Sequence, residues 1–419
     1  MLATVHHSIT DTQPLCQRGL VGAISRHQTV LYFGTKRCYS QAPMGSPFIY
    51  EDPLEPPEPL AGRTAELTLL WDRIAETRNS RLEGPRRYGK TSLLKAALAV
   101  ADRDGFIPIY VNFLGVLTAG DVAERIQRAY REQLEGSLKR WFAGVVATLR
   151  PSLKATPAGV GVELAPTTQM PHLLDLLALP RRLQERDGRQ CAIAFDEFQD
   201  VVRAGDALTG TIRSELEQHG TVAAYIFSGS HPGLMRDLFS DRRHAFFAQA
   251  KPIDLPRLEA ADLAEYVGSR FENGNRDPGE ALEPLLQTAD GHPQRAMLLA
   301  HHLYEHTKPA VVAGSDEWVK GFADATRDAN PEVQAAWDSW NNSERRLMAV
   351  ISQRTLPLQG QAARERYGIS KTGSNQNTID RLQGDGHIVA DESTATGWRV
   401  VDPLLALWLA NDRSWPLEA

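Results

Sequence analysis

The sequence predicts an α/β protein, in which helices cover both faces of a parallel sheet, followed by a helical C-terminal region. Three observations favour this fold. Short apolar, strand-like runs alternate with helix-like segments over residues 60–256. The glycine-rich stretch GPRRYGKTS, residues 84–92, leads into the helix-forming run LLKAALAV, and the apolar run CAIAFDEFQD, residues 191–200, ends in adjacent acids. Strands that alternate with helices build parallel sheets, which bind ligands at the carboxyl ends of their strands.

The composition is that of a soluble globular protein of two or three domains: 419 residues, 42% hydrophobic and 23% charged. No apolar run approaches the roughly 18 residues of a membrane span, so we expect no membrane partner. A net charge of -6 offers no general attraction to nucleic acid. The three cysteines, Cys16, Cys38 and Cys191, are odd in number, far apart and without a partner histidine spacing, which argues against a disulfide framework or a zinc site and favours a reducing cytoplasm.

Residues 1–45 differ from the rest, with four basic residues against one acid and no clear helix or strand period. An organelle transit peptide has this character. A spurious upstream extension, poorly ordered and ending near Met44, explains it as well, and we favour that interpretation.

The elements that follow are predicted in order. Residues 46–60 hold five prolines and should form an extended lead-in, and residues 61–76 carry apolar side chains at helical spacing. The strand expected before the glycine-rich loop is weak, only SRLE. Later segments are a helical region over 121–149, a loop or small hairpin over 151–171 and a helix over 211–220. Further strands are expected at residues 106–114, 191–200, 223–230 and 250–255.

The glycine-rich stretch matches the pattern of a phosphate-binding loop. Gly84 and Gly89 let the backbone curl so that N–H groups face a phosphate, Lys90 supplies a positive charge, and the Thr91 hydroxyl is suited to Mg²⁺. The remaining residues of the candidate loop are Pro85, Arg86, Arg87, Tyr88 and Ser92. A turn rich in glycine and arginine also matches this pattern by chance at times, so a second signal is needed.

The second signal lies about a hundred residues further on, at the end of CAIAFDEFQD. Asp196 would hold hydrated Mg²⁺, together with Thr91, and Glu197 would polarise the attacking water. The two motifs in this order predict a site for ATP or GTP. Ser228 and Ser230, at the end of AAYIFSGS, are sensor candidates for the γ-phosphate, although serine also simply ends many strands.

Five stretches together resemble the archaeal-type ATPases, prokaryotic members of the AAA+/STAND group of P-loop NTPases with a C-terminal winged helix. They are GPRRYGKTSLL, FDEFQ, IFSGSHPGLMRDLF, GHPQRAMLLAHHL and RVVDPLLALWL, and the resemblance spans about Phe48 to Leu409. It implies ATP as the nucleotide, because Gly62 and Arg63 fall in a GRTAEL box that borders the adenine in such proteins. It also implies that Arg295 reaches the phosphates from a helical lid.

The resemblance implies three folded parts: an ATPase domain over residues 46–256, a lid over 257–333 and a winged-helix domain over 334–419. The last part shows the expected order of three helices and a hairpin, with Asn342 or Ser343 capping its first helix. Arg242 and Arg243 are candidates for arginines that act across a homo-oligomer, or they belong to a solvated basic loop.

The winged helix would present polar residues suited to reading base edges: Lys371, Thr372, Ser374, Asn375, Gln376 and Arg381. The charge argues against this use, because residues 334–419 hold nine Lys/Arg against ten Asp/Glu. A protein contact is therefore at least as plausible a use of the domain. The sequence predicts a Mg²⁺-dependent ATPase or nucleotide switch. The alternatives are a DNA-binding regulator under nucleotide control, and a signalling or defence ATPase that oligomerises and acts on another protein.

Overall fold

The computed structural model describes residues 45–149, 166–369 and 374–416, apart from a few side chains within these ranges. The expected N-terminal extension, most of the expected loop or hairpin at 151–171, and Lys371 and Thr372 lie outside these ranges. Among the described residues, no helix combines the length and apolarity needed to cross a bilayer.

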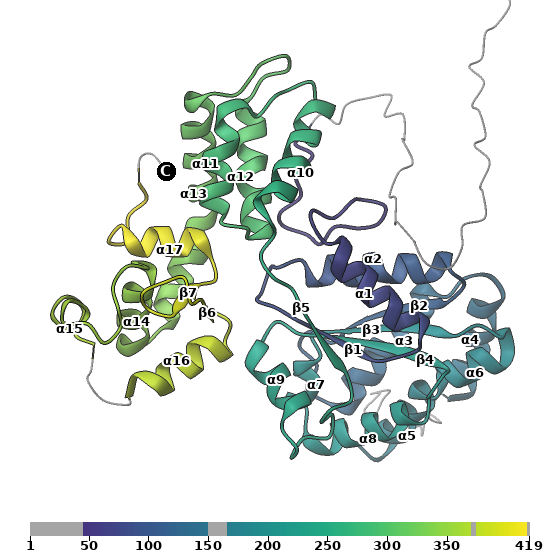
Figure 1. The fold of residues 1–419 in the computed structure, drawn as a ribbon. Coiled ribbons are helices and arrows are strands. Elements are labelled where there is room, and N and C mark those ends of the chain that lie inside the picture. Colours follow the sequence, from purple (N-terminus) through teal and green to yellow (C-terminus); the bar gives the residue numbers. More distant parts are fainter. Residues whose placement is uncertain (1–44, 150–165, 370–373, 417–419) are drawn as a thin grey trace, which may run out of the picture. The chain divides into compact units, whose positions relative to one another are not determined.

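A five-stranded, fully parallel sheet forms the centre of the first half of the chain, as predicted (Figure 1). Its strand order is β2-β3-β4-β1-β5. The strands are β1 (Ser80–Glu83), β2 (Ile107–Asn112), β3 (Cys191–Asp196), β4 (Ala223–Ser228) and β5 (Lys251–Asp254). The weak run SRLE is therefore a true strand, and it lies between β4 and β5, where neighbours on both sides supply its hydrogen bonds.

Alternate side chains of the central strands β3 and β4 enter two different cores, as strand geometry requires. On one face, Ala192, Ala194 and Ile226 pack against two helices, α1 (Thr64–Ala75) and α2 (Lys90–Arg103). On the other face, Ile193 and Phe195 pack in a larger core with a second group of helices. Those helices are α3 (Ala119–Gln133), α4 (Gly136–Leu149), α5 (Pro166–Leu177), α6 (Leu179–Asp187), α7 (Gln199–Arg203), α8 (Asp206–Glu217) and α9 (Pro232–Ser240).

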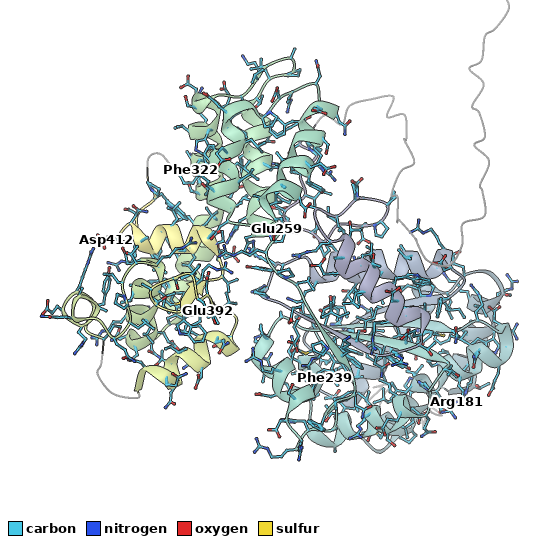
Figure 2. The ribbon with its side chains drawn as sticks, in the orientation of Figure 1. Arg181, Phe239, Glu259, Phe322, Glu392 and Asp412 are labelled. Carbon is cyan, nitrogen blue, oxygen red and sulfur yellow. The ribbon has the colours of Figure 1, made fainter. Side chains whose placement is uncertain are left out.

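A third core is formed mainly by helices that follow β5 in the chain. Its elements are α10 (Ala260–Asn273), the 3₁₀ turn η1 (Gly279–Ala281), α11 (Leu282–Ala289), α12 (Pro293–His306) and α13 (Ser315–Ser339). Phe322 of α13 belongs to this core, whereas Phe239 of α9 belongs to the large core against the sheet (Figure 2). Phe48 from the N-terminal lead-in is buried in the helical core as well.

The C-terminal residues build a fourth core. Its helices are α14 (Asn342–Ser352), α15 (Gln361–Tyr367), α16 (Ser374–Gly384) and α17 (Pro403–Ala410), and its antiparallel hairpin consists of β6 (Ile388–Ala390) and β7 (Trp398–Val400). The cap of α14 differs from our expectation: Asn341, not Asn342 or Ser343, accepts the first backbone N–H groups in a capping box with Glu344. The expected boundary at 333/334 falls inside α13, whose Val333 packs in this fourth core.

Candidate nucleotide site

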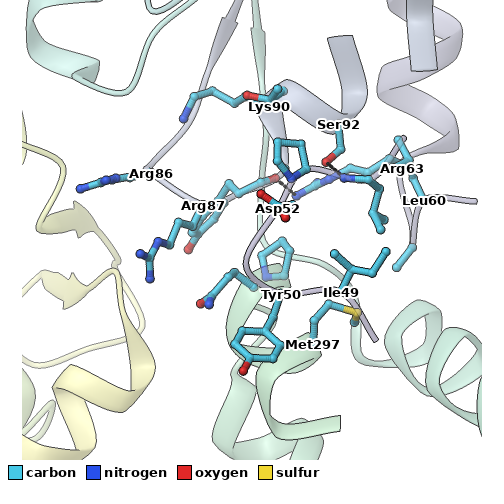
Figure 3. A pocket seen from close by; sticks show the side chains of 18 of the residues that line it. Ile49, Tyr50, Asp52, Leu60, Arg63, Arg86, Arg87, Lys90, Ser92 and Met297 are labelled. Carbon is cyan, nitrogen blue, oxygen red and sulfur yellow. Dashed lines mark hydrogen bonds between the residues drawn. The ribbon is translucent and has the colours of Figure 1, made fainter. Parts of the chain in front are cut away.

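A cavity of about 250 Å³ lies at the carboxyl end of the sheet, where the phosphate-binding loop was predicted. Most of the predicted loop residues and both predicted acids line it: Arg86, Arg87, Tyr88, Gly89, Lys90, Thr91, Ser92, Asp196 and Glu197. Gly84 and Pro85 do not line it. The rest of its wall includes residues of the lead-in and Ala61, which together we call the strap (residues 46–61), and residues of α12. Arg63, Ser230, Leu258 and Tyr266 complete it. Figure 3 shows Lys90 on one side of the pocket, with Ile49 of the strap and Met297 of α12 on the other.

The predicted loop connects β1 to α2 and ends in a left-handed glycine. Gly89 has φ of +82° and caps α2, a backbone conformation that favours glycine. Helix α2 then begins at Lys90, so its unpaired N–H groups lie next to the cavity. Gly84 is closely packed, since a Cβ there would lie 3.1 Å from Leu255 Cβ, a tight contact. This loop and helix N-terminus form a site suited to an anion.

Lys90 is buried and folds back on the loop. Its Nζ donates to the carbonyl oxygens of Gly84 at 2.8 Å and Pro85 at 2.6 Å. Burial lowers the pKa of Lys90 to about 8, although Asp196 and Glu197 act in the opposite direction. The lysine is therefore a poorly solvated charge beside the cavity, which a phosphate would stabilise.

Thr91 and Asp196, the two side chains predicted to bind Mg²⁺, are in direct contact. The Thr91 hydroxyl donates to Asp196 Oδ2 at 2.7 Å, and Asp196 is 2% exposed. The Tyr110 hydroxyl, from β2, donates to the same oxygen at 2.8 Å. Burial and the Asp196 carboxylate raise the pKa of Tyr110, so the phenol stays protonated. The sequence analysis did not predict a role for Tyr110. The alternation of Tyr110 with the buried residues Ile109 and Val111 in β2 could have indicated that its side chain lies on the opposite face of the sheet.

Glu197 follows Asp196 directly after the end of β3 and has a left-handed backbone conformation, with φ of +53°. Its Oε2 accepts from Gln199 Nε2 at 2.5 Å and from Ser230 Oγ at 2.7 Å. Ser230 lines the cavity. Ser228, the other sensor candidate, does not line it: it ends β4 fully buried, and its Oγ has no hydrogen-bond partner in the described part of the chain.

Arg63 lines the cavity, while Gly62 beside it does not. The Arg63 guanidinium donates to the Pro256 carbonyl at 2.8 Å and pairs with Glu66 at 3.2 Å. Gly62 has φ of +54°, and a Cβ there would lie 2.5 Å from an Asp262 oxygen. The GRTAEL box therefore fixes the turn between the strap and α1, with Arg63 as its contribution to the cavity.

The side of the cavity formed by the strap and the helical core is largely apolar. Ile49 and Leu60 of the strap line it together with Tyr266 and Met297. The backbone N–H of Leu54 donates to Ser92 Oγ at 3.0 Å, which fastens the strap to α2. The sequence predicted an extended lead-in but not this role, because prolines and scattered apolar residues carry no pattern that points to a ligand.

Arg295 does not line the cavity. It is 1% exposed, and its guanidinium pairs with Asp402, the N-cap of α17, and with Glu332 of α13 at 2.9 Å. Burial lowers the pKa of Arg295, but the two carboxylates more than offset this effect and raise it. Arg87 of the phosphate loop pairs with the same Glu332, so one carboxylate joins the loop to the arginine.

The other polar candidates are engaged locally. Arg243 pairs with Asp241, and Arg242 lies over the Phe247 ring. Arg381 of α16 pairs with the buried Glu344 at 3.1 Å. Of the remaining predicted base-reading residues, Gln376 donates to Asp380 at 2.7 Å. Asn375 also lies on α16, and Ser374 begins that helix.

No family model matches the chain, and no curated protein is significantly similar to it. Solved structures are similar. The Walker-type ATPase paby2304 of Pyrococcus abyssi has a TM-score of 0.62 at 17% identity, over 86% of this chain and 98% of that one. The ORC2 protein of Aeropyrum pernix, in its ADPNP–ADP complexes, has a TM-score of 0.55 at 17% identity, over 86% and 95%. The predicted resemblance is therefore confirmed at the level of the fold, and this chain has an α/β P-loop NTPase fold with a helical C-terminal region.

Proposed function

We propose that this chain binds ATP with Mg²⁺ in the cavity, hydrolyses it, and acts as a nucleotide switch. The observation that carries the proposal is the contact between the Thr91 hydroxyl and Asp196 Oδ2, 2.7 Å apart beside the buried Lys90. An ion pair or a hydrogen bond with a purely structural role would involve only two of the three residues Thr91, Asp196 and Lys90. Their meeting at the start of α2 is the arrangement that Mg²⁺-nucleotide binding requires.

The residues present fit Mg²⁺ chemically. A hydroxyl and a carboxylate are hard oxygen donors, and Mg²⁺ in nucleotide sites takes one or two such ligands and keeps several waters. Bound Mg²⁺ would supply charge neutralisation on the phosphate oxygens. The Tyr110 hydroxyl bond then orients the Asp196 carboxylate.

Two features support an adenine nucleotide. The apolar side of the cavity, with Ile49, Leu60 and Met297, offers surface on which a base is desolvated. The Aeropyrum pernix ORC2 structure, with the same fold, is described as holding ADPNP and ADP. The triphosphate would lie along the loop, where Lys90 would exchange the Gly84 and Pro85 carbonyls for phosphate oxygens.

Glu197 is our proposed general base. In this structure its Oε2 is held by Gln199 and Ser230. A water placed between Glu197 and the γ-phosphate would give its proton to that carboxylate as it attacks. Ser230, which lines the cavity, replaces Ser228 in our proposal as the hydroxyl that senses this region.

The switch rests on Arg87, Glu332, Arg295 and Asp402. Phosphate oxygens near the loop would compete with Glu332 for Arg87, because guanidinium groups bind phosphate as they bind carboxylate. Glu332 would then keep only its ion pair with Arg295, which also pairs with Asp402, the N-cap of α17. Nucleotide occupancy would thus bias contacts between the loop, α13 and α17. Arg295 itself would reach a phosphate only after leaving both carboxylates.

The experiment that tests the function measures ATP binding and phosphate release by the purified chain and by Glu197→Gln. We expect ATP affinity within a few-fold of wild type, and turnover lower by about 10²–10⁴-fold, the usual contribution of a general base. Glu185→Gln, at an exposed position of α6, is the matched control. Wild-type turnover in Glu197→Gln would refute the assigned base, and wild-type protein without ATP affinity would refute the function.

A further inference from the structure

We propose that His301, His302 and Glu305 of α12 form a binding site for a divalent transition-metal ion of the zinc class. One ligand atom from each of the three residues lies within 4.8 Å of the other two. His301 Nε2 lies 3.5 Å from Glu305 Oε1, and His302 Nδ1 lies 4.0 Å from Glu305 Oε2. Ligands of one tetrahedral zinc ion are about 3.4 Å apart, as bond lengths near 2.1 Å require. Small rotations of the three side chains would therefore bring their ligand atoms to the spacing that one zinc ion requires.

Helix geometry explains why these residues converge. Residues 301 and 305 are four apart and residues 302 and 305 are three apart, so Glu305 lies one turn beyond both histidines. His302 is mostly buried against α13, His301 is partly buried, and Glu305 is exposed. An ion could therefore enter from the Glu305 side, and its fourth position would face solvent and hold water.

The second ring nitrogen of each histidine already has an oxygen partner. His302 Nε2 lies 2.9 Å from Asp328 Oδ2, and His301 Nδ1 lies 3.3 Å from the carbonyl oxygen of Phe48. These partners select the tautomers that carry hydrogen on the outer nitrogens, which leaves His301 Nε2 and His302 Nδ1 as lone-pair donors toward Glu305. Metal-binding histidines are generally oriented by a carboxylate or carbonyl in this way.

The simpler explanation is that a histidine and a carboxylate merely join α12 to α13. One turn further along, His306 Nε2 lies 2.8 Å from Asp324 Oδ2, and this pair joins the same two helices. No second histidine was found to converge on it among the described residues. His306 thus provides an internal control for helix packing without metal binding.

The donor set decides the class of ion. Two imidazoles and one carboxylate suit Zn²⁺, Co²⁺, Ni²⁺, Cu²⁺ or Fe²⁺, whereas Mg²⁺ and Ca²⁺ prefer oxygen ligands only. The site is chemically distinct from the Thr91–Asp196 pair. The cysteine spacing argued against a zinc site, but the His-His-x-x-Glu sequence of residues 301–305 supplies ligands without any cysteine.

The site also touches the strap. The Tyr50 ring packs against His301 with 5.0 Å between centroids, and the Tyr50 hydroxyl donates to Asp328 Oδ2 at 3.2 Å. Tyr50 and its neighbour Ile49 line the cavity described above. An ion at His301 and His302 would therefore hold in place the histidine rings on which this part of the strap rests.

The test titrates Zn²⁺ into the full chain in buffer with millimolar Mg²⁺, which occupies sites that prefer oxygen ligands. Calorimetry should show one Zn²⁺ equivalent that is lost in His301→Gln and in Glu305→Gln and retained in His306→Gln. Asp328→Asn, which keeps all three ligands, should weaken Zn²⁺ binding about 10–100-fold. Co²⁺ should give the visible absorption of a tetrahedral ion in wild type and in His306→Gln, but not in His301→Gln or Glu305→Gln.

His301 and Glu305 are chosen for substitution because neither is fully buried, and circular dichroism would verify that each variant folds. Retention of the Zn²⁺ equivalent in folded His301→Gln and Glu305→Gln would overturn the proposal. So would its loss in folded His306→Gln, or the absence of any Zn²⁺ binding by wild type. The result does not depend on ATP hydrolysis.

Discussion

The two sides of the cavity are built on different principles. On the side of the phosphate loop, Lys90, Thr91, Asp196 and Glu197 are polar, and each is held by a neighbouring protein group. On the side of the strap, Ile49, Leu60 and Met297 contribute apolar surface from segments distant in the sequence. The first side should therefore determine affinity for phosphate and the chemistry, and the second should determine affinity for the rest of the ligand.

The largest effect on binding should come from Lys90→Ala. A charge-assisted hydrogen bond contributes about 1.5–3 kcal/mol, so we expect ATP affinity to fall roughly 10–100-fold. The affinity of Lys90→Ala for tripolyphosphate, which lacks a base, should fall by a similar factor. Lys139→Ala, at an exposed position of α4, is the control, and equal affinities of all three proteins for ATP would contradict the assignment of Lys90.

The ionisation of Lys90 should also make ATP affinity depend on pH, which is a smaller effect than the loss of the lysine. Its pKa is lowered to about 8 by burial, and a bound phosphate would favour the protonated form. Binding therefore takes up a proton above pH 8, and ATP affinity should fall by up to about tenfold per pH unit from there. Below pH 8 the lysine is already charged, so this effect disappears.

Lys90→Arg is the matched variant for that measurement, because arginine stays protonated throughout the range. Calorimetry between pH 7 and pH 9 should show a steeper loss of ATP affinity in wild type than in Lys90→Arg. Parallel pH profiles would mean that another group titrates.

The smallest effect should distinguish the two sides. Met297→Ala removes roughly 1 kcal/mol of apolar contact, so ATP affinity should fall about three- to tenfold. Affinity for tripolyphosphate should not change, in contrast to Lys90→Ala. Val319→Ala, on the exposed surface of α13, is the control. If Met297→Ala weakens both ligands equally, the apolar side does not hold the base.

The contrast between the two sides also explains how far the sequence could be interpreted. The phosphate loop and the acidic strand end were predictable because phosphate and Mg²⁺ chemistry needs particular residues at short, fixed spacing. The parallel sheet was predictable from alternation, although β1, with the sequence SRLE, has little strand propensity of its own. Hydrogen bonds to the two neighbouring strands, β4 and β5, stabilise β1 in place of local strand propensity.

The remaining features depend on contacts between distant residues. Nothing near Arg295 in the sequence indicates that Asp402, more than a hundred residues later, would pair with it. The Tyr110 hydroxyl reaches Asp196 only because β2 and β3 are neighbouring strands, paired in a register that places Tyr110 opposite Ala194. The strap lines the cavity because Phe48 is buried among α10 and α12, and a proline-rich segment does not show this in advance.

The wall of the cavity joins an N-terminal strap, a central loop and a helix near residue 297. A ligand bound there adds RT ln(1 + [L]/Kd) to the free energy that holds these three segments together, about 2.7 kcal/mol at a hundred times Kd. That amount is a substantial fraction of the stability of an ordinary domain. The concentration of nucleotide in the surroundings would then help to determine how long the chain resists unfolding and proteolysis.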